Sequence, residues 1–232
     1  MCATFWALGD EPTDMTLLHY TPPMQPYLSV LYRDDDIVVL NKPSGLLSVP
    51  GKEPHHYDSS YSRLLLVLPT ARVVHRLDMA TSGILLFALN KTAQANIQRQ
   101  FERRSVHKTY RAQVYGQPPA QTGYIDLPLR CDWPNRPRQM IDLVQGKSAQ
   151  TAYRLLHTNS LGALLELTPI SGRSHQLRVH MQALGTPICG DKFYAGTAAF
   201  AAAPRLLLHA ESLQLSHPSS DRAMAFHCPA EF

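Results

Sequence analysis

The side chains that could do chemistry gather in one short run, Val73–Gly83, which reads VVHRLDMATSG. His75, Arg76 and Asp78 lie within four residues, and a turn of small residues then leads into the apolar run Ile84–Leu89. A carboxylate held at the entrance of a buried strand is a candidate reactive group, because loops on a rigid scaffold are where chemistry usually takes place. On the charges alone, however, a solvated pair of Arg76 and Asp78 is the commoner arrangement.

The elements that must position this run indicate an α+β fold, with a mixed, largely antiparallel β-sheet flanked by helices. The predicted strands cover residues 27–40 around a turn at 33–36, 84–89, 107–116, 124–129, 148–157, 161–168, 206–215 and 224–228. Three helices are predicted. The first is capped by Asp58 or Ser59 and runs to Leu68, and the second is capped by Asn90 and covers 91–104. The third covers 175–184 and stops at Gly185. We expect one domain over 27–232, preceded by a poorly ordered leader, 1–26.

Composition narrows the class of protein. The chain has 232 residues, of which 44% are apolar and 17% charged, so it can bury a core and is neither a charged disordered chain nor a coiled coil. A net charge of +4 permits a nucleic-acid partner without requiring one. No apolar run is long enough to cross a membrane, and four scattered cysteines without a CxxC predict neither a zinc site nor a disulfide framework. We therefore expect a soluble, cytoplasmic protein without a metal.

Three basic segments allow both a nucleic-acid and a structural interpretation. Lys42, in the loop LNKPSGLLSVPG, either contacts a phosphate or faces water. Trp133, in RCDWPNRPRQ, either stacks on a partner or covers an edge of the core. The arginines at the end of the helix predicted over 91–104 serve either RNA or the helix dipole. They are Arg99, Arg103 and Arg104.

Several standard catalytic constellations are absent from the sequence. It contains no GxSxG elbow, Walker loop, GxGxxG or HExxH motif, and His175 and His180 are badly spaced to ligate a metal from one helix face. Two interpretations remain: an enzyme that uses a carboxylate without metal or cofactor, or a non-catalytic RNA-binding protein.

Four ordered motifs favour the enzyme, because together they resemble the RluA-type pseudouridine synthases. The resemblance covers about 27–232 and is carried by LNKPSGLLSVPG at 40–51, HRLD with Ser82-Gly83, KTYRA at 108–112, and GRSHQLRVH at 172–180. The segment CDWPNRPRQ, at 131–139, and the lack of an extra N-terminal RNA-binding domain resemble family members that modify both 23S ribosomal RNA and tRNA. The leader has no counterpart in this resemblance.

The resemblance implies a pseudouridine synthase catalytic domain that isomerises uridine to pseudouridine after flipping the base out of the RNA, with no cofactor. Asp78 matches the catalytic aspartate, which acts as nucleophile or base, and Arg178 matches the basic residue paired with it. Tyr110 matches the tyrosine that packs on the uracil, and Arg76 matches an arginine that holds the RNA open. We also expect His75 and Arg173, which lie in these motifs, to bind substrate.

The implied substrates are a 23S rRNA loop and a tRNA anticodon stem-loop, modified by a monomer. One alternative is the same reaction on a different rRNA or tRNA uridine. The other is an RNA-binding or RNA-folding factor without turnover, although a carboxylate such as Asp78 would then only weaken binding to a polyanion.

Overall fold

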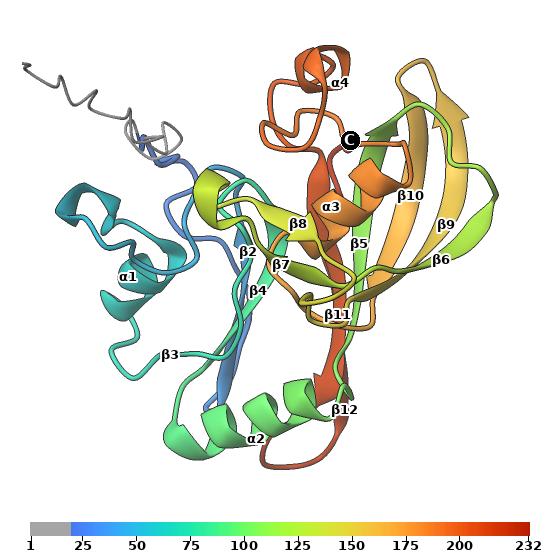
Figure 1. Cartoon of the computed structure of the whole chain (residues 1–232). Helices are drawn as coiled ribbons and strands as arrows, with labels where there is room; N and C mark the ends of the chain where they lie inside the picture. Colours follow the sequence, from blue (N-terminus) through green and yellow to red (C-terminus); the bar gives the residue numbers. More distant parts are fainter. Residues whose placement is uncertain (1–19) are drawn as a thin grey trace, which may run out of the picture.

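The computed structural model describes residues 20–232, which form one long twisted sheet with helices packed against it (Figure 1). The strands of the main sheet run in the order β1-β2-β4-β11-β5-β10-β9-β6, with β3 paired to β4 and β12 paired to β11. Only β4 and β11 pair in parallel among these described strands, and every other pairing is antiparallel. The predicted mixed, largely antiparallel sheet is therefore confirmed.

The strands have the following bounds: β1 Val30–Arg33, β2 Ile37–Lys42, β3 Arg72–Val73, β4 Ser82–Ala88, β5 His107–Tyr115, β6 Thr122–Asp126, β7 Leu129–Cys131, β8 Gln139–Ile141, β9 Gln150–Asn159, β10 Gly162–Pro169, β11 Leu208–Ser216 and β12 Ala223–His227. The strands β7 and β8 form a separate two-stranded sheet. The strands β3, β7 and β8 have only two or three residues each, which is too short to show an alternating pattern in the sequence. The sequence therefore did not predict these three strands.

The helices begin where capping side chains predict. In α1 (Ser60–Leu65), Ser59 accepts a hydrogen bond from the Ser62 amide, and in α2 (Lys91–Glu102) Asn90 accepts one from the Ala93 amide. The helix α1 ends three residues before the predicted Leu68. The helix α3 (Gln176–Ala183) ends before Gly185, which has a positive φ as expected of a C-terminal glycine. A short helix, α4 (Thr197–Ala201), was not predicted.

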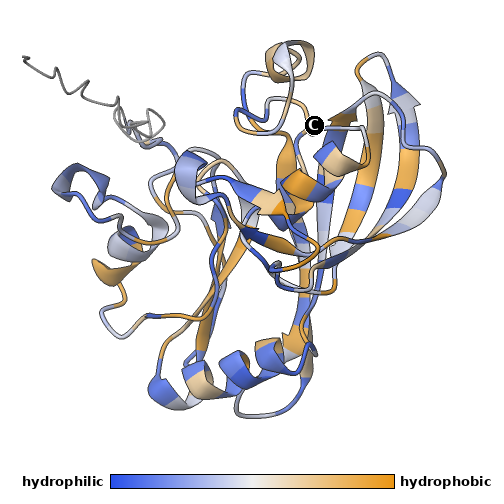
Figure 2. Cartoon of the chain, viewed as in Figure 1, coloured by the Kyte–Doolittle hydropathy of each residue, from blue (hydrophilic) through white to orange (hydrophobic). Residues whose placement is uncertain are grey.

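The strand β4 lies at the centre of one half of the molecule and is buried on both faces. Its Ile84 and Leu86 pack into one cluster with Ile97 of α2, while Leu85 and Phe87 pack into another cluster on the opposite face. Burial on both faces explains why this strand reads as a continuous apolar run rather than an alternating one (Figure 2). It provides a rigid support for the reactive run that precedes it.

The predicted leader falls partly outside the described residues, since 1–19 are not described. Of the remainder, Tyr20 donates a hydrogen bond to the Asp58 carbonyl and accepts one from the Leu47 amide, and the Met24 sulfur accepts one from Arg63. Residues 20–26 thus pack beside α1. Among the described residues, no helix is long and apolar enough to cross a membrane, and no three His, Cys, Asp or Glu side chains are grouped to hold a metal ion.

Candidate active site

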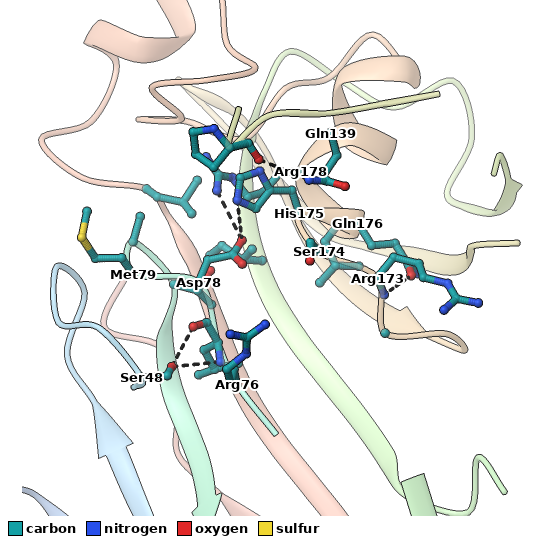
Figure 3. Close-up of a pocket in the computed structure, with 18 of the residues that line it drawn as sticks. Ser48, Arg76, Asp78, Met79, Gln139, Arg173, Ser174, His175, Gln176 and Arg178 are labelled. Carbon is teal, nitrogen blue, oxygen red and sulfur yellow. Dashed lines mark hydrogen bonds and ion pairs between the residues drawn. The ribbon is translucent and has the colours of Figure 1, made fainter. Parts of the chain in front are cut away.

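A cavity of about 860 Å³ opens where the loop before β4 meets β5, the start of α3 and the β7–β8 sheet. Asp78 lies in it, between Met79 and the side chains of α3 (Figure 3). Among the described residues that line the cavity, Asp78 is the only acid, whereas six are basic: Arg76, Lys108, Arg136, Arg173, Arg178 and Lys192. The cavity is therefore a cationic pocket with a single carboxylate.

Asp78 faces the guanidinium of Arg178. The Asp78 Oδ2 atom accepts a hydrogen bond of 3.3 Å from Arg178 Nη1, while Oδ1 accepts none from the described residues. The Asp78 side chain is 28% exposed and that of Arg178 only 4%. The two residues belong to separate sequence motifs, one hundred positions apart, and the fold brings their side chains together.

The position of Asp78 depends on Gly83 at the start of β4. Gly83 has φ +108°, and a Cβ atom there would lie 2.3 Å from the carbonyl oxygen of Ala210 on β11. Only glycine fits this backbone and this close approach. The parallel pairing of β4 with β11 therefore requires the glycine. That pairing sets where the loop that carries Asp78 enters the sheet.

The loop that carries Asp78 is also held by hydrogen bonds from side chains of the segment that follows β2. Ser48 both donates to the Leu77 carbonyl and accepts from the Leu77 amide, at 2.7 and 3.0 Å (Figure 3). Ser44 donates to the carbonyl of Ala80 at 2.7 Å. Backbone groups on both sides of Asp78 are thus held, which limits the movement of its carboxylate.

Both sequence interpretations of Lys42, as a phosphate contact or as a residue that faces water, are wrong. The side chain is buried and does not line the pocket. It is 1% exposed, and its Nζ donates to the carbonyls of Pro43, Leu46 and Met79 at 2.8–3.0 Å. Burial lowers the pKa of Lys42 to about 7, against the attraction of Asp78. A lysine pattern in a loop cannot reveal such burial, since most lysines are solvated.

Arg178 is held in turn by Asp191, a residue that the sequence did not single out. The Asp191 carboxylate, 1% exposed, accepts from Arg178 Nε and Nη2, both at 2.8 Å. It also accepts from the amides of Phe193 and Tyr194. Burial disfavours the charged guanidinium, but the hydrogen bonds and charge of Asp191, together with Asp78, raise the pKa of Arg178 above its ordinary value.

His175 faces the same oxygen of the Asp78 carboxylate, Oδ2, that accepts the hydrogen bond from Arg178. It precedes α3 with φ 53°, in the left-handed region, and its Nε2 is 3.8 Å from Asp78 Oδ2. Its Nδ1 is 2.6 Å from the Tyr194 hydroxyl, and its ring stacks on Phe193. Burial lowers the pKa of His175 although Asp78 opposes the shift. In the sequence, His175 lies in the GRSHQLRVH motif, and its spacing from His180 indicated a poor metal ligand.

Tyr110 extends from β5 into the pocket and packs against two core clusters. Burial, followed by the negative charge of Asp78, raises the pKa of its phenol well above the ordinary value. The phenol is therefore protonated at neutral pH and can act as a hydrogen-bond donor. Tyr110 and Asp78 therefore line the same cavity.

The residues expected to bind substrate occupy different parts of the pocket wall. Arg76 is exposed, and exposed Arg173 donates from Nε to the Ser148 carbonyl at 3.1 Å. The His75 Nε2 accepts from the Leu86 amide at 2.9 Å. Burial, with a smaller effect of Lys108, lowers the pKa of His75 to about 3, so the ring is neutral and supports the loop through this bond.

At the rim, the loop between β7 and β8 presents an aromatic and a cation together. Trp133 is 64% exposed, and the Arg136 guanidinium lies 4.8 Å from its ring centroid. The interpretation of Trp133 as a cover for the core edge is therefore wrong. An exposed aromatic beside an arginine can stack on an unpaired base.

A single carboxylate, paired with a buried arginine within a cationic pocket, suits an enzyme that acts on a polyanion. Residues 36–183 match the model of the RNA pseudouridylate synthase family. The chain belongs to this family, and the predicted class of enzyme, an RNA pseudouridine synthase, is confirmed.

Individual relatives agree with this assignment over nearly the whole chain. The dual-specificity RNA pseudouridine synthase RluA of Escherichia coli (strain K12) is 52% identical over 219 residues, which cover 94% of this chain and 100% of that protein. The RluA of Haemophilus influenzae is 48% identical with the same coverage. The solved structure of human RNA pseudouridylate synthase domain containing 1 aligns with a TM-score of 0.73 and 31% identity, over 87% of this chain and 83% of that one. The pseudouridine synthase fold is therefore confirmed.

Proposed function

We propose that this enzyme converts uridine to pseudouridine in two kinds of RNA, a loop of 23S rRNA and the anticodon stem-loop of tRNA. The observation that carries the proposal is the Asp78–Arg178 pair inside a pocket whose other charged lining is basic. The dual-specificity name of relatives 52% and 48% identical supports the choice of two substrates. Both rRNA and tRNA are cytoplasmic in the bacteria that hold these relatives, which supports a cytoplasmic location for this enzyme.

In the proposed reaction the N1–C1′ bond breaks, the uracil turns, and C5 bonds to C1′. The C5 proton is lost and N1 gains one, so no atoms are gained or lost overall. Asp78 acts on the ribose through its Oδ1, which accepts no hydrogen bond from the described residues and is free to approach the sugar. It either attacks C1′ or removes a ribose proton. A cavity of about 860 Å³ leaves room for the detached base to turn.

Arg178 and Tyr110 complete the proposed catalytic set. Arg178 holds Oδ2 of Asp78 and fixes which carboxylate oxygen faces the sugar. Tyr110 packs its ring on the uracil, and its phenol, kept protonated by burial, takes part in removing the C5 proton by relaying it rather than by acting as a strong base.

The target nucleotide must leave its stack to reach Asp78, which costs roughly a few kcal/mol. We propose that Arg76, exposed at the mouth of the pocket, fills the vacated space, while Arg173 binds phosphate. His75 forms part of the wall that the nucleotide passes, with its Nε2 committed to Leu86. We propose that the enzyme acts as a monomer.

The test is a pseudouridine-specific assay on tRNA and 23S rRNA that lack the modification. The proposal predicts product in both RNAs at a defined uridine. Product in only one RNA would contradict dual specificity and keep the reaction. Product at another position would move the target to a different uridine, and tight binding without product in either RNA would refute the enzymatic proposal.

A further inference from the structure

The environment of His175 fixes which of its ring nitrogens carries the proton. The Tyr194 hydroxyl accepts a hydrogen bond from the Gln139 amide at 2.8 Å and lies 2.6 Å from His175 Nδ1. A phenol whose oxygen already accepts can donate its own proton to Nδ1. The neutral ring then carries its hydrogen on Nε2, the nitrogen that faces Asp78.

The opposite tautomer is disfavoured by the charge beside it. With the hydrogen on Nδ1, the lone pair of Nε2 would point towards Asp78 Oδ2 across 3.8 Å, and two electron-rich atoms would face each other. With the hydrogen on Nε2, a donor faces an acceptor. Burial keeps His175 neutral, so it presents one hydrogen to the pocket and not a full positive charge.

The distance between these two atoms is informative. At 3.8 Å, Nε2–H and Oδ2 are too far apart to bond directly, yet one atom about 2.8 Å from each would complete two hydrogen bonds. That atom must accept from His175 and donate to Asp78, and a hydroxyl oxygen does both. A carbonyl cannot donate, and an N–H cannot accept.

An internal uridine of an RNA chain carries one free hydroxyl, the ribose 2′-OH, since its 3′ and 5′ oxygens are in phosphodiesters. We propose that His175 Nε2 and Asp78 Oδ2 together hold the 2′-hydroxyl of the target uridine, which makes His175 a residue that selects ribose over deoxyribose. The inference rests on the proposed role of Asp78 at the sugar. It leaves Oδ1 free for the reaction and uses the 2′-OH, the group that distinguishes RNA from DNA.

The experiment compares two stem-loop RNAs that differ only in a uridine or 2′-deoxyuridine at the target position. For wild type, His175→Leu and His175→Gln, Kd and the single-turnover rate are measured on each RNA. Leucine fills space without a donor, whereas the glutamine amide can place a donor near the position of Nε2. Both substitutions put an ordinary side chain at the same left-handed residue, so their backbone strain is matched.

We expect wild type to prefer the ribose substrate and His175→Leu to reduce that preference roughly 3- to 10-fold, the effect of one neutral hydrogen bond. His175→Gln should restore part of the preference. If the deoxyuridine RNA does not react, the ratio of Kd values gives the preference. If His175 had only a structural role, the substitutions would impair binding and reaction of both RNAs by the same factor. An unchanged preference for the ribose RNA in His175→Leu would therefore overturn the inference. Absence of product with wild type on the ribose RNA would instead refute the proposed function.

Discussion

Replacing Asp191 by asparagine tests how the Asp78 carboxylate is held through Arg178. Three donors converge on Asp191 Oδ1: Arg178 Nη2 and the amides of Phe193 and Tyr194. The asparagine oxygen therefore stays at that position and its NH₂ group replaces Oδ2, facing the Nε–H of Arg178. Two donors would then oppose each other, next to a guanidinium that is 4% exposed and has lost one of its two counter-charges.

The size of the effect follows from these contacts. One hydrogen bond to a charged group contributes about 1.5–3 kcal/mol, and breaking a fully buried ion pair costs about 3–5 kcal/mol. Since Asp78 still faces Arg178, we expect Asp191→Asn to lower the free energy of unfolding by about 2–4 kcal/mol. We also expect a single-turnover rate about 10- to 100-fold lower, because a reactive group misplaced by about 1 Å can lose that much.

Urea denaturation at pH 7 and single-turnover kinetics on a stem-loop RNA measure both effects. The control is Asp126→Asn, which changes an exposed acid whose carboxylate, among the described residues, accepts a hydrogen bond only from the Gln150 side chain. This substitution should alter the free energy of unfolding by about 0.5 kcal/mol or less. Wild-type stability and rate in Asp191→Asn would refute the account of how Arg178 is held.

Three further changes test neighbouring groups. Tyr110→Phe should bind RNA within about threefold of wild type but react at least about tenfold more slowly, and a normal rate would leave the tyrosine only a packing role. Burial lowers the pKa of Lys42 from its ordinary value of 10.5 to about 7. Between pH 7 and pH 10.5 this lysine is therefore protonated in the unfolded chain and largely neutral in the folded one. The unfolding free energy of wild type relative to Lys42→Met should therefore rise with pH in this window, by up to about 1.4 kcal/mol per unit, and a flat difference would contradict it. The pKa of His75 is lowered to about 3, so its stabilisation should be present above pH 6.5 and disappear towards pH 3. Relative to His75→Gln, wild type should lose stability as the pH falls through that window, and parallel acid transitions for the two proteins would count against the buried neutral ring.

Local signals in the sequence were sufficient for much of the fold. Ser59 and Asn90 cap their helices as predicted, because a capping bond joins residues only three apart. The apolar run at 84–89 gives β4 because burial on both faces removes the need for alternation. The β7–β8 sheet was missed, since strands of three residues have too few positions for a pattern.

The candidate site was predictable only in part. Asp78, Arg178 and Tyr110 were found through motifs, and the fold places all three at one pocket. Asp191 and Tyr194 were not singled out from the sequence. Asp191 acts through its contact with Arg178 and Tyr194 through its contact with His175, and no local pattern encodes such contacts. Lys42 shows the same limit, because whether a lysine is solvated or buried depends on segments distant in the chain.

The most direct test of the central claim is Asp78→Asn, assayed for both RNA affinity and pseudouridine. Removing the one carboxylate that lines the described pocket should leave binding equal to wild type or tighter, because the RNA is a polyanion. It should also abolish product, because an amide neither attacks C1′ nor removes a ribose proton. Product formed at a rate close to that of wild type would contradict the assignment of Asp78 and the mechanism built on it.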